Sequence, residues 1–243
     1  MKKILPFIIL IIGVGVVVGV FLFMKSKNTS KEEVQEVETE EIIPEIAFDK
    51  RPVVSLIPSN DGHWLKFRIE KILIDAVTLD YELTYKVPDG RTQGVPGTVK
   101  LTTKEDIEKE LLLGSESSGK FRYDEGVERG NVVLRLRDDN GKLVAKFETE
   151  FFLQSGKTEI TTPAGIYSLD KPNNEIYYVS MNTIGYPGEY SGDVDLAFGI
   201  FTSSLKYNSG TFDSGDIRFY DDGEWVELNE NKSSDTGFFL LPS

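Results

Sequence analysis

Alternation of apolar and polar side chains dominates the chain beyond about residue 51. From Val77 to Val87 every second residue is valine, leucine or tyrosine, and the residues between them are polar. Apolar side chains recur with the same spacing of two in segments 65–69 and 132–136. Because successive side chains of a strand point to opposite faces, each segment predicts a strand with one buried and one solvated face.

Turn residues between the apolar segments predict hairpins. Asp139-Asn140-Gly141 separates the strand at 132–136 from a second strand at 143–152, and Asp221-Asp222-Gly223-Glu224 separates 217–220 from 225–228. Asp-Gly and Asn-Gly pairs suit the positive backbone φ of two-residue hairpin turns. Three further apolar segments are also predicted to be strands: 176–181, 194–200 and 238–241.

One segment predicts a helix. Thr102 and Glu105 have the spacing of a capping box, Ile107 and Leu111 follow at helical spacing, and Gly114 suits a helix end. We expect a short helix here that connects two strands.

These patterns together predict a mainly β protein. Strands about ten residues apart, with Gly, Asn, Asp and Pro between them, favour an antiparallel β-sandwich of immunoglobulin-like or jelly-roll-like type. The length allows one or two sandwich domains, and Gln154–Lys157 is the most plausible boundary. We therefore expect a β-sandwich domain over 51–155 and a second β-rich domain, or a continuation of the same sandwich, over 156–243.

An apolar segment near the N-terminus predicts a membrane anchor. Residues 4–24 contain no charge, and a helix over them would be about 30 Å long, enough to cross the hydrocarbon core of a bilayer. A cleaved signal peptide is the alternative, but Phe21–Met24 offers no small residue for cleavage. We therefore predict that residues 1–27 form a single-pass anchor with flanking lysines. The lipid bilayer is then one partner of the protein, through residues 4–24.

The residues after the anchor are strongly acidic. Segment 28–50 is rich in glutamate and predicts a flexible stalk. Because an acidic, cysteine-free β-rich body behind an anchor is typical of an exported domain, we expect a cytoplasmic N-terminus and an extracellular body. Within the span, Gly15 and Gly19 form a G-x-x-x-G pattern, which would allow a homodimer through the membrane helix.

Composition excludes several functions. The chain of 243 residues has no cysteine and a net charge of -13, so it offers no disulfide, thiolate metal site or thiol nucleophile, and no basic surface for nucleic acid. Thr162–Tyr167 (TPAGIY) resembles a stretch of L,D-transpeptidase catalytic domains, but that family attacks with a cysteine. His63, the single histidine, sits in a predicted turn, which favours a structural role over catalysis.

Two groups of residues are candidate sites. Loop acids offer hard oxygen ligands to calcium, the only cofactor that we consider; the preferred set is Asp213, Asp216, Asp221 and Asp222. The same residue types are also common in hairpin turns. Tyrosines with glycine and serine between them are typical of adaptable recognition surfaces. The candidate ligand-binding residues are Tyr186, Tyr190 and Tyr207, with segment 184–192 as the binding loop.

The sequence favours a non-catalytic function. We expect a membrane-anchored module that binds an extracellular protein or glycan, or contributes to envelope assembly. One alternative is a cell-envelope hydrolase acting through carboxylates, and another is a structural subunit held by its membrane helix. A concave pocket holding two or three titratable groups with shifted pKa values would favour the hydrolase.

Overall fold

The computed structural model describes residues 45–103, 105–206 and 208–243. Residues 43–243 form a compact unit by themselves. No helix within the described ranges has the length and apolarity needed to cross a bilayer. The predicted anchor over 4–24, with Gly15 and Gly19, lies outside the described residues.

The described part of the chain is mainly β, as predicted. Two 3₁₀ helices interrupt the strands, η1 (Phe48–Lys50) and η2 (Asn229–Asn231). The strands of the first half are β1 (Val53–Pro58), β2 (Trp64–Glu70), β3 (Thr78–Lys86), β4 (Thr92–Lys100), β5 (Ile107–Leu112), β6 (Gly114–Ser117), β7 (Lys120–Tyr123), β8 (Arg129–Arg137) and β9 (Leu143–Ser155). The second half contributes β10 (Glu159–Thr162), β11 (Gly165–Leu169), β12 (Tyr177–Asn182), β13 (Val194–Thr202), β14 (Gly210–Phe212), β15 (Arg218–Asp221), β16 (Glu224–Glu227), β17 (Lys232–Ser233) and β18 (Phe238–Pro242).

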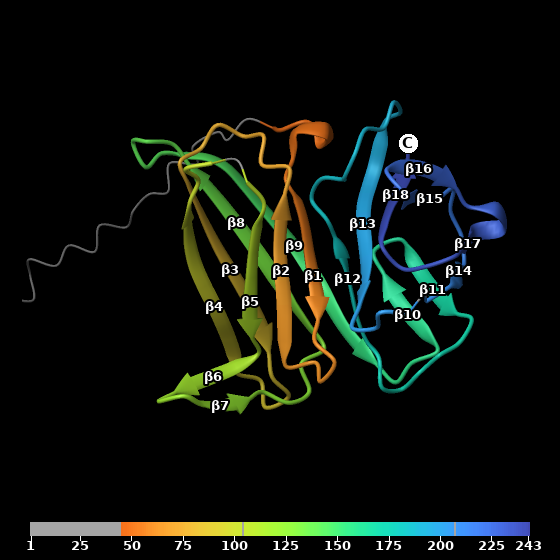
Figure 1. The fold of residues 1–243 in the computed structure, drawn as a ribbon, viewed down its shortest axis with the longest axis horizontal. Coiled ribbons are helices and arrows are strands. Elements are labelled where there is room, and N and C mark those ends of the chain that lie inside the picture. Colours follow the sequence, from red (N-terminus) through yellow and green to blue (C-terminus); the bar gives the residue numbers. More distant parts are fainter. Residues whose placement is uncertain (1–44, 104, 207) are drawn as a thin grey trace, which may run out of the picture. The chain divides into compact units, whose positions relative to one another are not determined.

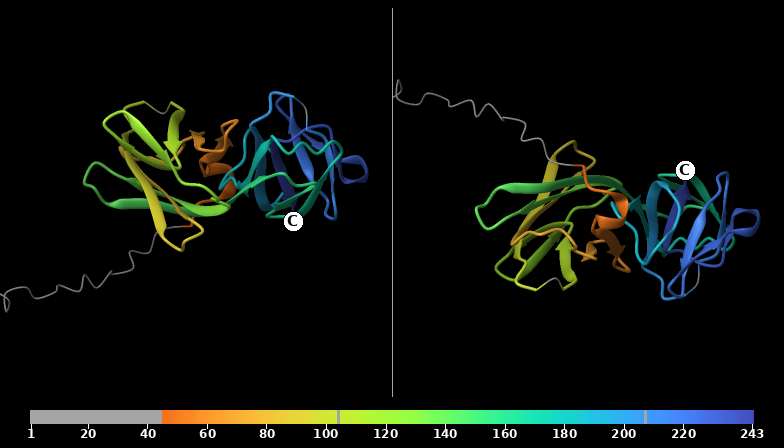
Figure 2. Two further views of the ribbon diagram at one scale, coloured as in Figure 1. Left: turned by 90° about the horizontal axis from the view of Figure 1, so that it is seen from below. Right: turned by 90° about the horizontal axis from the view of Figure 1, so that it is seen from above.

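A nine-stranded antiparallel sheet runs through both halves of the sequence (Figure 1). Its strand order is β16-β15-β18-β13-β12-β9-β8-β3-β4. A three-stranded sheet, β1-β2-β5, and a four-stranded sheet, β10-β11-β14-β17, form further layers, which can be followed from two more directions in Figure 2. The architecture is thus sandwich-like, and β9 pairs with β8 on one side and with β12 on the other.

The two larger hydrophobic cores of the described residues lie on opposite faces of the long sheet. The first core joins the β1-β2-β5 layer to β3, β8 and β9, and the second joins the β10-β11-β14-β17 layer to β13, β15 and β18. Strand β12 contributes to both: Tyr178 is buried in the second core and the next residue, Val179, in the first. This is the expected consequence of the strand period of two when both faces of a sheet are covered.

The predicted strands and hairpins agree with the structure. The alternating segment 77–87 corresponds to β3, whose burial alternates along its length. The β8–β9 hairpin turns at Gly141 (φ +78°), where the Asp138 carboxylate accepts the backbone N–H of Lys142 at 2.9 Å. The β15–β16 hairpin turns through Asp222 (φ +44°) and Gly223 (φ +93°). The apolar C-terminal segment becomes β18, between β13 and β15.

The prediction of a helix over Thr102–Gly114 is wrong. Residues 107–112 form strand β5, which pairs antiparallel with β2. Ile107 and Leu111 are buried, while Glu108 forms ion pairs with Lys66 and Arg68 of β2. The spacing of four that suggested a helix also places two side chains on one face of a strand. Pairing with β2 therefore overrides the local helix signals.

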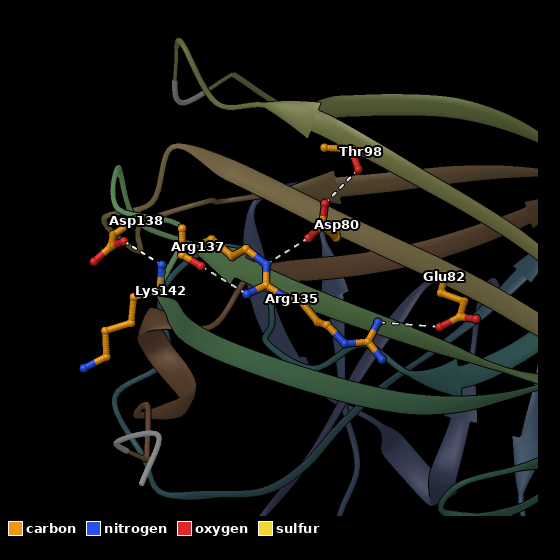
Figure 3. Close-up of polar contacts among 8 residues, drawn as sticks. Asp80, Glu82, Thr98, Arg135, Arg137, Asp138 and Lys142 are labelled. Atoms are coloured by element: carbon orange, nitrogen blue, oxygen red, sulfur yellow. Dashed lines mark hydrogen bonds and ion pairs between the residues drawn. The ribbon is translucent and has the colours of Figure 1, made fainter. Parts of the chain in front are cut away.

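The solvated face of the sheet carries a polar network over β3, β4 and β8 (Figure 3). The Asp80 carboxylate accepts hydrogen bonds from the Thr98 hydroxyl at 2.7 Å and from Arg137 Nε at 3.1 Å. Two residues further along each strand, the Arg135 guanidinium lies 3.5 Å from the Glu82 carboxylate. These cross-strand contacts explain how charged residues alternate with core residues along β3 and β8 without being buried.

The folded unit begins before residue 51. Residues 45–50, the end of the predicted stalk, include η1, and Phe48 packs against a small cluster around Tyr186 and Leu240. The Arg51 guanidinium lies 4.1 Å from the centre of the Phe48 ring and donates from Nε to the Ile46 carbonyl at 2.7 Å. Aromatic and cation–π contacts thus attach this segment to the body.

Candidate functional site

The predicted tyrosine loop follows β12 and lines a cavity. Tyr186 is buried and Tyr190 is half-buried, and both line the same cavity. The third predicted residue, Tyr207, lies outside the described residues. The structure therefore brings two of the three predicted residues together.

Lys71 fixes the loop to the end of β2. Its ammonium donates to the carbonyl oxygens of Tyr186 and Gly188, each at 3.2 Å, and lies 4.9 Å from the centre of the Tyr186 ring. The Lys71 backbone has φ +56°, a conformation that is uncommon for a residue with a side chain. These contacts place a lysine at the cavity wall, where it supports the loop.

Aromatic contacts hold the far side of the loop. The Trp225 indole N–H donates to the Pro187 carbonyl at 3.2 Å, and its ring meets the Tyr186 ring edge-on with centroids 6.1 Å apart. Gly188 has φ +62°, and a Cβ there would lie 2.8 Å from the Tyr220 ring. The loop is thus held from β2 and from β15–β16, so its cavity is preformed.

The cavity has a volume of about 670 Å³. This is within the usual size of small-molecule sites. Carboxylates outnumber cations in its lining: the acids are Asp49, Glu70, Asp106 and Glu189, and the cations are Lys50 and Lys71. Leu73, an exposed leucine, adds an apolar wall. The arrangement offers hydrogen-bond acceptors beside aromatic and apolar surface.

Three groups at the cavity have shifted pKa values. Burial raises the pKa of the Glu70 carboxyl, and the negative charge of Asp106 raises it further. Burial lowers the pKa of the Lys71 ammonium and raises that of the Tyr186 phenol. The Lys71 ammonium and the Tyr186 ring are engaged in packing the loop, which accounts for their burial. Glu70 is the shifted group that can hold or release a proton inside the cavity.

The predicted calcium ligands are dispersed over loop and hairpin. The Asp213 carboxylate accepts the backbone N–H of Ile166 at 3.2 Å, and Asp216 forms an ion pair with Arg218 at 2.6 Å. Asp221 and Asp222 belong to the β15–β16 hairpin. Within the described ranges, no three His, Cys, Asp or Glu side chains come close enough together to hold a metal ion. The calcium hypothesis gains no support from this arrangement, and we do not propose it.

Several cavity residues were missed in the sequence. Lys71 and Glu70 lie more than 110 positions before Tyr186, and Asp106 precedes β5, where a helix was expected. The sequence offered one local signal for them: Glu70 and Lys71 stand at the end of a segment with strand alternation, where a strand gives way to a loop. Their meeting with the tyrosine loop depends on β1, which pairs with β2 and contacts β12 and β13.

Comparisons with known proteins give no family for this chain. No family model matches the sequence, and no curated protein matches it either.

Proposed function

We propose that this chain is a single-pass membrane protein whose body binds a ligand without transforming it. In this proposal residues 4–24 cross the bilayer, the N-terminus is cytoplasmic, and the body is extracellular, of the immunoglobulin-like or jelly-roll-like sandwich type. The ligand is an extracellular protein or glycan, which docks at the cavity formed by Tyr186, Tyr190 and Glu70.

One observation carries the proposal: a preformed cavity holds aromatic, apolar and acceptor groups side by side. Tyr190 is half-exposed and offers the aromatic surface, the buried Tyr186 ring supports it, and Glu70 and Asp106 supply carboxylates. Because the loop is held from two sides, little conformational entropy is lost when a ligand binds. A rigid aromatic surface with nearby polar groups is typical of recognition sites.

A second candidate is a hydrolase that uses the same cavity. The Glu70 carboxyl, whose pKa is raised by burial, and the Asp106 carboxylate line the same cavity and favour it, since glycoside hydrolysis uses a pair of carboxyl groups. Against it, the shifted Lys71 and Tyr186 are committed to packing the loop. Binding therefore remains the preferred function.

Capture by the purified body, residues 43–243, tests the proposal. The body is immobilised and exposed to solubilised envelope from the source cell, beside the variants Tyr190→Ala and Glu70→Gln. We expect the native body to retain a protein or glycan and both variants to retain at least about tenfold less, since a lost cavity contact of about 1.4 kcal/mol changes affinity tenfold. The control is Leu205→Ala, an exposed leucine that does not line this cavity.

The two candidates separate in the same experiment. A hydrolase would release soluble fragments from the envelope, and Glu70→Gln would stop the release while retaining the ligand. Equal retention by the native body and both variants would contradict binding at this cavity. A structural subunit held by its membrane helix would instead lose assembly when Gly15 and Gly19 are replaced by leucine in the full chain.

A further inference from the structure

The β6–β7 hairpin exposes two aromatic rings to solvent. Phe121 is 46% exposed and Tyr123 is 38% exposed. Among the described residues, no other aromatic side chain is as exposed. Both rings project from β7, a strand whose residues are all exposed. Because exposed aromatic rings forfeit burial energy, a pair of them on one strand indicates a contact surface.

The two rings lie between two aromatic side chains of the β1–β2 hairpin, and the four rings together form a row. The Trp64 ring meets Phe121 edge-on with centroids 5.4 Å apart, Phe121 and Tyr123 are 6.3 Å apart, and His63 stacks on Tyr123 at 4.3 Å with planes 12° apart. Trp64 and His63 come from the end of the β1–β2 connection. We call Trp64, Phe121, Tyr123 and His63 the aromatic row.

Backbone contacts hold the two hairpins together. The Leu113 N–H donates to the His63 carbonyl at 2.8 Å, and the Asp124 N–H donates to the Leu113 carbonyl at 3.0 Å. The turn before His63 is fixed by Gly62 (φ +71°), against which the Tyr177 ring packs so closely that a Cβ would lie 2.3 Å from it. The aromatic row is therefore preorganised.

A cavity of about 500 Å³ adjoins the row at His63. Its lining contains both signs of charge: the acids are Asp61, Asp124, Glu125 and Glu128, and the cations are Arg129 and Lys157. Tyr85 donates to Asp124, and Ser59 donates to Asp61. The side chains of Glu128, Arg129 and Lys157 line this cavity and are exposed to solvent.

This lining selects the chemistry of the ligand. Four carboxylates against two cations repel an anionic polymer, and the net charge of -13 adds to the repulsion. A purely cationic ligand would leave Arg129 and Lys157 facing like charge. A hydroxyl both donates and accepts, so a neutral polyol satisfies carboxylates and cations together. A sugar ring also has an apolar C–H face that fits against aromatic rings.

We propose that the aromatic row and its adjoining cavity bind a neutral oligosaccharide. The exposed rings of Phe121 and Tyr123 contact the apolar faces of the sugar units. Glu128, Arg129 and Lys157 exchange hydrogen bonds with the hydroxyls of the unit in the cavity. This site is separate from the cavity at Tyr186 and Tyr190, so it does not depend on the function proposed there.

Titration calorimetry of the body, residues 43–243, tests this proposal. The probes are neutral hexasaccharides of β-1,4-glucose, β-1,4-mannose and β-1,4-N-acetylglucosamine, with hexagalacturonate and hexalysine as charged counterparts. We expect at least one neutral hexasaccharide to bind with a Kd below about 1 mM. Tyr123→Ala is expected to weaken that binding at least about tenfold, the equivalent of one lost aromatic contact.

Variants at exposed positions keep the fold and sharpen the outcome. Phe121→Ala and Glu128→Gln are also expected to weaken binding of the neutral sugar, whereas Leu205→Ala, at an exposed leucine that lines neither cavity, is expected to leave that binding unchanged. Absence of binding by all three neutral hexasaccharides to a folded body overturns the proposal, as does unchanged affinity in Tyr123→Ala. Binding of hexalysine alone overturns it in favour of a cationic peptide, and binding of hexagalacturonate alone overturns the charge argument.

Discussion

Two buried tyrosines converge on Asn208, and this arrangement gives a sharp test of how the second core is held. The Tyr167 hydroxyl donates to the Asn208 backbone carbonyl at 3.0 Å, and the Tyr178 hydroxyl donates to the Asn208 side-chain oxygen at 3.1 Å. Tyr167 is on β11 and Tyr178 on β12, so Asn208 joins two layers. Tyr167→Phe and Tyr178→Phe each leave one acceptor of Asn208 unpaired.

The expected cost follows from burial. Tyr167 is completely buried, and Tyr178 and Asn208 are nearly so. An acceptor left unpaired at such a site costs about 1–3 kcal/mol, so each single variant should lower the free energy of unfolding by that amount. For a body of this size, 1 kcal/mol corresponds to a fall in Tm of about 2–4 °C.

Combination with Asn208→Ala separates the two tyrosines. Alanine removes the side-chain oxygen that Tyr178 uses but retains the backbone carbonyl that Tyr167 uses. Tyr178→Phe and Asn208→Ala should therefore couple by about 1–2 kcal/mol, while Tyr167→Phe and Asn208→Ala should be additive within about 0.5 kcal/mol. Urea unfolding of residues 43–243, followed by tryptophan fluorescence and analysed with a common m value, measures all five variants.

Equal coupling energies for the two tyrosines would refute this reasoning. The Asn208 contribution would then be a matter of packing, with no separate acceptors for the two hydroxyls. A change in m between the variants would also weaken the comparison, because it would mean that the unfolded or native ensemble had changed in compactness.

Three further variants test the core, the solvated face and the first cavity. Phe239→Ala removes a fully buried ring at the centre of the second core and should cost about 3–5 kcal/mol in urea unfolding. Hydrogen bonds from Thr98 and Arg137 lower the pKa of Asp80, so its contribution is complete above the unfolded value of 3.8 and is lost as pH falls through the lower folded pKa. Asp80→Asn should therefore lower the free energy of unfolding by about 1 kcal/mol at pH 7, seen as a lower Tm, and this cost should shrink progressively as pH falls below 3.8. Burial raises the pKa of Glu70, so the folded state loses stability as pH rises above the unfolded value of 4.5. Glu70→Gln removes the buried charge and should raise the free energy of unfolding at pH 7, measured by urea unfolding. A lower free energy of unfolding in this variant would contradict the idea that burying Glu70 is costly.

Much of the fold could be predicted because its strands are half-buried. Along β3 and β8 the sheet has one wet and one dry face, so the pattern of the sequence reports burial directly. Prediction failed at β5, where the polar residues between Ile107 and Leu111 mask the alternation and the cap-like residues before them suggest a helix. Only the antiparallel pairing with β2 decides that segment, and pairing of residues about 40 positions apart has no local signature.

The sites were less predictable than the strands. The composition of segment 184–192 pointed to Tyr186 and Tyr190. The cavity also needs Glu70 and Lys71, which lie at the end of β2 and are far from that segment in sequence. The aromatic row was also missed. His63 and Trp64 are adjacent in sequence, whereas Phe121 and Tyr123 lie almost sixty residues later and join them only through the contact of two hairpins. Sequence composition can mark a loop, but it does not report which distant strand end completes a site.

The shared strand β12 limits how this protein can be divided. A cut at the predicted boundary between residues 155 and 156 would remove four buried residues from the first core, which is otherwise supplied by the first half: Val179, Met181, Ile184 and Phe201. It would also bare the edge of β9, a strand of thirteen residues that pairs with β12. A long unpaired edge beside an opened core is a template for aggregation. Fragments made at this boundary should therefore be insoluble, and any transplant of one binding surface to another protein must carry the strands of both halves.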